Sequence, residues 1–270
     1  MFDPWVVALV AGMLGLNIGS FLNVCSLRWP QDESVVRPPS RCPKCGEGVR
    51  WYDNIPVLSW LILRGRCRFC AEPISMQYPL VELATGLMFA GVFAAYGPSW
   101  ESLRGVVFLT MLFGISLSDA RFYIIPDEFS IGGTVVGICL AFLPGGIDWL
   151  PALIGAAGGY VVLWLVAVVG TWVMKKLFPG RLEEAGVDTA MGGGDIKMMM
   201  MVGAFVGIWG VAETLFMGSV LALIVFAPLA SLSKRLIPLG VFLAAGGAVT
   251  YVWGEAMLNW YLTQVVGLTL

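Results

Sequence analysis

The sequence predicts an all-α polytopic membrane protein with about eight transmembrane helices and a small cytoplasmic zinc-knuckle loop domain. Of its 270 residues, 58% are hydrophobic and only 13% are charged, a composition outside the range of soluble globular proteins. The apolar residues form runs long enough to cross about 30 Å of hydrocarbon. Lys and Arg concentrate in alternate connecting segments, which orients such a chain. The chain has no His, so the commonest general base and metal ligand is excluded.

The first apolar segment covers Trp5 to Leu27. At 1.5 Å per residue it can span the bilayer. No basic segment precedes it, and Asn17, Ser20 and Asn23 lie where a helix would pack on other helices. We therefore expect residues 1–27 to be a retained transmembrane helix and not a cleaved signal peptide.

A polar segment rich in Pro and Cys follows, from Arg28 to Tyr78. It holds half of the basic residues of the chain, namely Arg28, Arg37, Arg41, Lys44, Arg50, Arg64, Arg66 and Arg68. The positive-inside rule places such a loop in the cytoplasm. We expect residues 28–78 to form the loop domain and residues 79–270 to form the main helix bundle.

The rest of the chain contains further apolar segments at Pro79–Tyr96, Leu103–Leu117, Phe129–Leu143, Leu150–Met174, Ile196–Gly210, Val211–Leu229 and Leu236–Tyr251. Alternating these spans brings Lys175, Lys176, Arg181, Lys234 and Arg235 to the cytoplasmic side, with Arg104 as the exception. The same topology puts Asp119 and Asp195 at cytoplasmic helix ends. The two carboxylates can therefore meet at one depth.

The loop contains two Cys-x-x-Cys pairs, Cys42 with Cys45 and Cys67 with Cys70. Their spacing predicts a four-thiolate zinc site, which would fold a loop too small to bury a core of its own. A pair of disulfides is the alternative, and reducing cytoplasmic conditions disfavour it. Cys25 and Cys139 lie in apolar spans, and we expect both to be small buried hydrophobic residues.

Several carboxylates lie at or inside the predicted spans, where a charge is costly and therefore indicates function. Asp195 follows three glycines, Gly192, Gly193 and Gly194, and precedes an apolar run, whereas Asp119 closes an earlier span. Two carboxylates that share a site leave one proton between them and can position a water for attack on an amide.

Three other charged residues have weaker assignments. Glu82, inside the second span, is a candidate for substrate contact. Asp127 follows Pro126 near a predicted helix start, where a capping role is favoured. Lys197 lies two residues after Asp195 and is a candidate tuning or interfacial charge.

Together these motifs resemble the prepilin peptidases, the bacterial inner-membrane aspartic peptidases of the GxGD type that cleave type IV prepilins and type II secretion pseudopilins. The matching elements are Gly19-Ser-Phe-Leu-Asn-Val24, the two cysteine pairs, Ile55-Pro-Val-Leu-Ser-Trp60, Tyr78-Pro-Leu-Val-Glu82, Asp119 with Ile125-Pro-Asp127, Gly192-Gly-Gly-Asp195-Ile-Lys197 and Ile237-Pro-Leu-Gly240. Two departures are Ser118, where an apolar residue is usual, and Leu239, where Phe is usual.

The resemblance implies that Asp119 and Asp195 are the catalytic pair of an endopeptidase that acts at the cytoplasmic membrane face. It also implies methylation of the new N-terminus with S-adenosylmethionine. The expected partners are prepilin or pseudopilin substrates and membrane lipid, with no nucleic acid. We expect Glu82, the glycines Gly192 to Gly194 and Lys197 to contact the substrate.

The direction of the helix dipoles supports one further hypothesis. Asp119 ends a predicted helix and Asp195 begins one, so Asp195 would be the ionised acid that activates water and Asp119 the protonated acid that polarises the carbonyl.

Two other functions remain open from the residues alone. In a proton-coupled transporter, Glu82, Asp119 and Asp195 would form a relay. In a structural assembly factor, the zinc loop would bind cytoplasmic partners.

Overall fold

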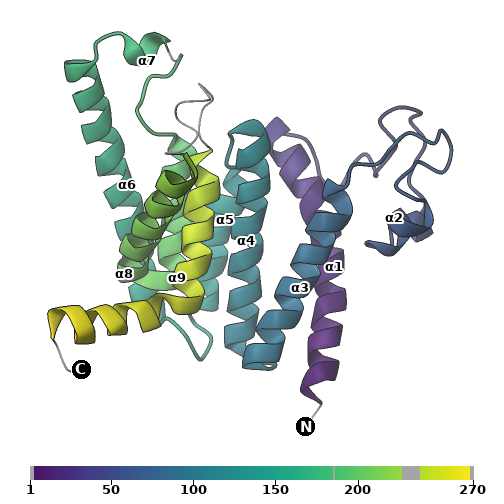
Figure 1. Cartoon of the computed structure of the whole chain (residues 1–270), viewed down its shortest axis with the longest axis horizontal. Coiled ribbons are helices and arrows are strands. Elements are labelled where there is room, and N and C mark those ends of the chain that lie inside the picture. The colour runs from purple at the N-terminus through teal and green to yellow at the C-terminus, as the bar shows by residue number, and fades with distance from the viewer. Residues whose placement is uncertain (1–2, 185, 227–237, 268–270) are drawn as a thin grey trace. The chain divides into compact units, whose positions relative to one another are not determined.

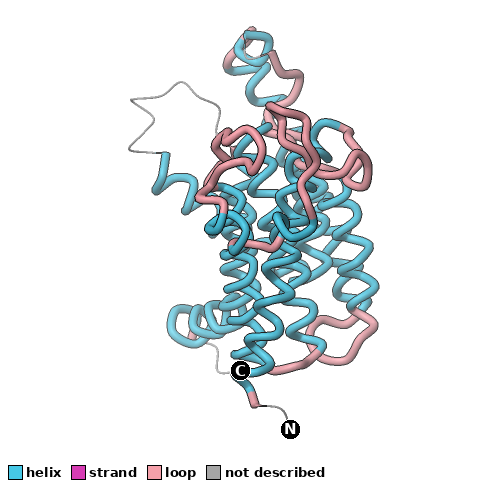
Figure 2. The backbone as a smooth tube through the Cα atoms, turned by 90° about the vertical axis from the view of Figure 1, so that its right-hand side faces the viewer, coloured by secondary structure: helices cyan, strands magenta, loops and turns pink. Residues whose placement is uncertain are grey.

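The computed structural model describes residues 3–184, 186–226 and 238–267, and these residues form helices and loops without a β-strand (Figures 1 and 2). Six of the described helices are long and apolar enough to cross a membrane. They are α1 (Pro4–Arg28), α3 (Gln77–Tyr96), α4 (Trp100–Phe122), α6 (Trp149–Leu177), α8 (Gly193–Phe226) and α9 (Leu239–Tyr261). The predicted all-α membrane fold is confirmed. Lys234 and Arg235, predicted in an inner loop, lie outside the described residues.

The chain divides into two compact units, Met1–Thr110 and Met111–Leu270, with the boundary inside α4. In the first unit, α1 and α3 pack antiparallel through small residues. A Cβ atom added to Gly12 would lie 3.3 Å from Cβ of Ala90, and one added to Gly19 would lie 2.7 Å from Cα of Glu82. Glycines at these positions let the two helix backbones approach closely.

The segment between α1 and α3 has little regular structure. It contains the short helices η1 (Trp29–Gln31), η2 (Trp51–Asn54) and α2 (Leu58–Ile62). Two isolated antiparallel bridges, between Arg41 and Gly48 and between Arg66 and Pro73, complete it. Such a segment needs a cross-link to hold one conformation.

The second unit is built around α8, which folds back on itself at Gly207. This glycine has φ 71° and ψ −177°, a backbone conformation that only glycine adopts readily. A Cβ atom added to Gly159 on α6 would overlap the carbonyl oxygen of Met199 and lie 3.3 Å from Val211. Because a straight helix would separate residues 199 and 211 by about 18 Å, both can touch Gly159 only if the helix reverses.

The two arms of α8 have different partners in the second unit. The first arm packs against α6, and a Cβ atom on Gly203 would overlap the carbonyl oxygen of Gly155. The second arm packs antiparallel to α9, where a Cβ atom on Gly246 would lie 2.7 Å from the carbonyl oxygen of Thr214. Backbone contact at these glycines fixes the positions of the three helices.

The number of long helices differs from the eight predicted spans. The predicted segments Ile196–Gly210 and Val211–Leu229 both fall on α8 as far as Phe226, beyond which residues 227–229 lie outside the described residues, and the turn comes at Gly207 and not after Gly210. The predicted span Phe129–Leu143 corresponds to α5 (Asp127–Leu140), whose 14 residues are too few to cross about 30 Å. The described part of the unit also contains α7 (Arg181–Glu184) and the π-helical η3 (Leu262–Val266).

Candidate active site and metal centre

Asp119 lies in the last turn of α4 and is buried, with 6% of its surface exposed. Its Oδ2 accepts a hydrogen bond from the backbone N–H of Val241 at 3.1 Å. Val241 is the third residue of α9, and the N–H groups of a first helical turn have no partner within their own helix. The start of α9 therefore supplies a donor and a positive dipole end to this carboxylate.

Asp195 lies in the first turn of α8 and is partly buried. Its Oδ2 would lie 3.3 Å from a Cβ atom on Gly192, so the carboxylate turns back toward the residues before the helix. Asp195 lies close enough to Asp119 for the two charges to interact. The structure thus brings the two acids to one region, with Asp195 in the first turn of α8 and Asp119 against the first turn of α9.

Ile125 joins the two helix starts. A Cβ atom on Gly194 would lie 3.0 Å from Cβ of Ile125, and one on Gly240 would lie 2.9 Å from Cδ1 of the same side chain. The Cβ atom on Gly240 would also lie 2.9 Å from Oδ2 of Asp119. Neither glycine has room for a side chain, so their small size sets how closely α8 and α9 approach the acids.

This arrangement removes the basis for assigning the shared proton by helix dipoles. Asp119 does end α4, as the sequence indicates, but it also accepts from the start of α9. Both acids therefore face a positive helix end. The helix ends do not distinguish the ionised acid from the protonated one.

Lys197 and Asp127 form an ion pair that the sequence analysis did not predict. Nζ of Lys197 lies 2.7 and 2.9 Å from the two carboxylate oxygens of Asp127. Pro126 is the N-cap of α5 and has no side-chain capping bond. Asp127 is therefore not the capping residue, but it does lie in the first turn of α5, where the helix dipole favours an acid as predicted, and its ion pair links α5 to α8. Both residues lie near predicted helix starts on one membrane side, which is the signal that could have paired them.

The other predicted contact residues have different surroundings. Glu82, in the first unit, is 7% exposed, and its Oε2 accepts a hydrogen bond from the backbone N–H of Val57 at 2.7 Å. Gly192 and Gly193 are exposed, and no atom lies within 4 Å of a Cβ atom added to Gly193. Glu82 thus holds the loop on α3, whereas Gly193 has open space around it and Gly192 lies against the carboxylate of Asp195.

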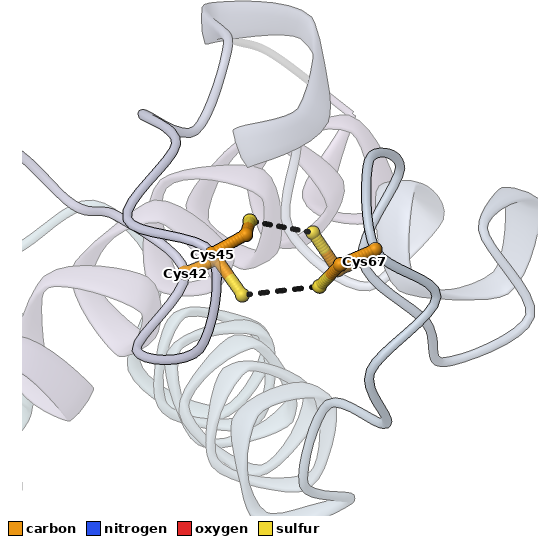
Figure 3. A group of neighbouring side chains, drawn as sticks. Cys42, Cys45 and Cys67 are labelled. Carbon is orange, nitrogen blue, oxygen red and sulfur yellow. Dashed lines mark hydrogen bonds between the residues drawn. The ribbon is translucent and has the colours of Figure 1, made fainter.

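The four predicted cysteine ligands form one cluster (Figure 3). Sγ of Cys42 lies 3.7 Å from Sγ of Cys70, Sγ of Cys45 lies 4.0 Å from Sγ of Cys67, and all four sulfur atoms lie within 4.8 Å of one another. Tetrahedral zinc with Zn–S bonds of about 2.3 Å requires S–S separations of about 3.8 Å. The cysteines are free, so their geometry fits zinc and not the alternative of two disulfides.

Each cysteine pair is held by its own tight turn. The N–H of Cys42 donates to the carbonyl of Glu47, and the N–H of Cys67 donates to the carbonyl of Glu72 in the equivalent position. Backbone N–H groups of Cys45 and Lys44 lower the pKa of the Cys42 thiol to about 6. A thiolate is the form that binds metal, so the turn itself prepares this ligand.

The two remaining cysteines differ from each other. Cys25 is 1% exposed, which confirms the prediction of a buried residue. Cys139 is exposed on α5, so the same prediction was wrong there. A thiol is apolar enough to face lipid as well as a protein core.

Comparison with known proteins identifies the family. Residues 13–96 match the bacterial peptidase A24 N-terminal domain, and residues 106–227 match the type IV leader peptidase family. A prepilin leader peptidase/N-methyltransferase of Aeromonas hydrophila is 33% identical over 97% of this chain and 96% of its own length. The chain belongs to the type IV leader peptidase family.

Other members of the family show similar agreement. The prepilin leader peptidase/N-methyltransferase of Neisseria gonorrhoeae is 32% identical over 98% of both chains. That of Myxococcus xanthus is 42% identical over 76% of this chain, and the match spans 57% of the relative's length. No solved structure matches the chain. Family membership and the six apolar helices make this a multi-pass membrane protein, and they give no support to the transporter alternative.

Proposed function

We propose that this member of the leader peptidase family is an aspartic endopeptidase that cleaves the leader from type IV prepilins or type II secretion pseudopilins. The observation that carries the proposal is that Asp195, in the first turn of α8, and Asp119, which accepts from the first turn of α9, lie in one region. The names of the relatives support the substrate class.

The mechanism uses one proton shared by the two carboxyl groups. The ionised carboxylate removes a proton from a water, which attacks the carbonyl carbon of the scissile amide, while the protonated carboxyl donates to the carbonyl oxygen. The C–N bond then breaks, and the leaving nitrogen takes up a proton from the pair. The hydrogen bond from Val241 holds Asp119 in position, and the open space at Gly193 admits an extended peptide backbone.

Replacing either acid tests the peptidase proposal. Asp119→Asn and Asp195→Asn should each reduce cleavage of a prepilin by at least about a thousandfold, because a neutral amide cannot share the proton. Purified enzyme in detergent is mixed with a prepilin, and the shortened product is measured by mass. Glu213→Gln is the matched control, because Glu213 is a partly buried carboxylate on the second arm of α8. Cleavage near the parent rate by either Asn variant would overturn the assignment.

We further propose that the enzyme methylates the new N-terminus with S-adenosylmethionine as methyl donor. The support is the N-methyltransferase in the names of the relatives. The transfer moves a methyl group from the sulfonium to the free amine and releases one proton. Incubation with labelled S-adenosylmethionine and a prepilin should label the mature product. Unlabelled product from an enzyme that cleaves normally would contradict this second activity alone.

The location proposed for the enzyme is the bacterial inner membrane, with the cysteine-containing loop and the candidate active site facing the cytoplasm. The support is the concentration of basic residues between α1 and α3. We also propose that the cysteine cluster holds structural zinc, supported by the sulfur separations. Metal analysis of the purified protein should give about one zinc per chain. A content well below one would contradict the site.

A further inference from the structure

Helix α2 exposes its aliphatic side chains and buries a polar one, the reverse of what is expected for a helix on a water-exposed loop. Leu58, Leu61 and Ile62 are 50%, 59% and 66% exposed, whereas Ser59 is 6% exposed. The hydroxyl of Ser59 donates to the carbonyl of Tyr52 and accepts from the N–H of Ile55. A contiguous group of exposed aliphatic side chains on one short helix indicates a surface that contacts something apolar.

The start of α2 is fixed at a depth inside the first unit. The N–H of Val57 donates to Oε2 of Glu82, which is the sixth residue of α3. Glu82 in turn lies level with Gly19 of α1, since a Cβ atom on that glycine would lie 2.7 Å from Cα of Glu82. Gly19 precedes Arg28, the last residue of α1, by nine residues, which is about 13 Å along the helix.

This depth places α2 beside the apolar parts of α1 and α3, and not beyond their ends. Figure 1 shows α2 next to the upper part of α3. Both helices are apolar enough to cross a membrane. The exposed leucines and isoleucine therefore lie level with apolar parts of two helices that are able to cross a membrane.

The aliphatic face of α2 is held in its outward orientation by the residues around it. Nε1 of Trp60 donates to the carbonyl of Ile74 at 3.1 Å. The N–H of Gly65 donates to the carbonyl of Trp60, and a Cβ atom on Gly65 would lie 2.6 Å from the indole ring. Because the indole packs inward, the aliphatic side chains on the opposite face cannot turn into the loop. Arg64 and Arg66 follow directly and are exposed.

We propose that α2 is an interfacial anchor that inserts Leu58, Leu61 and Ile62 into the cytoplasmic leaflet, with Arg64 and Arg66 at the phosphates of anionic phospholipids. The combination of an apolar face with flanking basic residues is the one that binds a helix in the plane of an anionic membrane. The depth set by Glu82 favours lipid over a soluble partner or a second copy of the chain. The inference does not depend on the proposed peptidase activity.

Lipid photolabelling of the full-length protein tests the anchor. The protein is reconstituted in vesicles of phosphatidylcholine and phosphatidylglycerol that contain a phospholipid with a diazirine in its acyl chain. After irradiation, trypsin releases residues 51–64, which include α2, and residues 45–50 of the cysteine-containing loop as an internal control. Lipid adducts should map to residues 58–62 at about ten times the level of the control peptide.

Three outcomes would overturn the anchor. One is labelling of residues 58–62 no higher than that of residues 45–50. Another is oxidation of Leu61 and Ile62 by hydroxyl radicals in the aqueous phase as fast as oxidation of Val36, which is 77% exposed on the same loop. The third is absence of lipid adducts together with chemical cross-links between residues 51–64 of two chains, which would identify a second copy as the occupant.

Two variants separate the apolar contribution from the charged one. Leu61→Asn with Ile62→Asn should abolish the adducts, whereas Val36→Asn should leave them unchanged. Arg64→Gln with Arg66→Gln keeps the aliphatic face, and trypsin then releases residues 51–68 in place of 51–64. It should lower the adducts several-fold in vesicles with phosphatidylglycerol and leave them unchanged in pure phosphatidylcholine. Equal loss in both vesicles would contradict the assigned role of the arginines.

Discussion

The geometry of the cysteine-containing loop and that of the candidate active site are fixed by opposite kinds of contact. In the loop, four sulfur atoms within one short segment define the geometry, and much of the surrounding chain is exposed. At the acids, residues 122 positions apart in the sequence meet, and the contact is made by glycines at helix starts. The loop should therefore tolerate added volume but not loss of a ligand, whereas the acid site should respond to a single added methyl group.

Removing a metal ligand should have the largest effect. Cys42→Ser, or a strong chelator, should release the metal and unfold the loop, since the apparent binding energy of structural zinc is of the order of 10 kcal/mol. Metal content and the rate of trypsin cleavage after Arg50 would report this. Cys139→Ser changes an exposed cysteine outside the cluster and should retain the metal. Full metal content in Cys42→Ser would remove the distinction between the two regions.

Crowding the contact between α6 and α8 should have the second-largest effect. In Gly203→Ala the new methyl carbon would overlap the carbonyl oxygen of Gly155, so the helices must separate, at a cost of about 3 kcal/mol. Thermal unfolding in detergent measures the loss. Gly91→Ala, where nothing lies within 4 Å of the added atom, should unfold at the parent temperature or above. Equal unfolding temperatures for the two variants would show that the backbone contact is not needed.

A methyl group beside Asp119 should affect activity more than stability. Gly240→Ala places its Cβ 2.9 Å from Oδ2 of Asp119, and displacing a reacting group by part of an ångström lowers rates about ten- to a hundredfold. We expect a lower kcat with little change in KM in a prepilin cleavage assay. Gly132→Ala on α5 has open space around it and should cleave normally. An unchanged kcat in Gly240→Ala would mean that α9 does not position the acid.

The smallest effect is expected inside the loop. Ala71 has φ 58°, whereas the equivalent residue of the other cysteine turn is Gly46, with φ 74°. Ala71→Gly should relieve the backbone strain. Glycine also raises the entropy of the unfolded chain, which offsets part of this gain, so the metal-bound loop should be stabilised by about 0.5 kcal/mol. Gly46→Ala should destabilise it by a similar amount. The chelator concentration that releases half of the metal measures the effect of each variant. If this concentration shifted in the same direction in both variants, the two cysteine turns would not be equivalent.

The same contrast explains what could be predicted from the sequence. The spacing of Cys42, Cys45, Cys67 and Cys70 carries the loop geometry, because all four ligands lie close together in the chain. The apolar runs and the basic loops predicted that Asp119 and Asp195 lie at helix ends at one depth. The bond from Val241 and the pair between Lys197 and Asp127 depend on helix packing between distant segments. No local pattern records such contacts.

The turn in α8 shows a related limit. Gly203, Gly207 and Gly210 are all candidates for a break in the apolar run. In the structure, Gly203 lies against α6, and only Gly207 of the three has a positive φ. The choice among them is made by the neighbouring helix, so the sequence predicted the fold-back only to within three residues.

The early turn at Gly207 also affects the surrounding bilayer. The first arm of α8, residues 193–206, and its neighbour α5 each have 14 residues, and Gly133 of α5 lies directly against Met201 of that arm. A helix of this length covers about 21 Å, whereas the hydrocarbon layer is about 30 Å thick. The first arm is largely buried, whereas Ile131 and Val135 of α5 are exposed, so we expect lipid beside α5 to thin or head groups to enter below the usual surface. We therefore expect the acid at the start of the first arm to lie beside a locally thin part of the membrane.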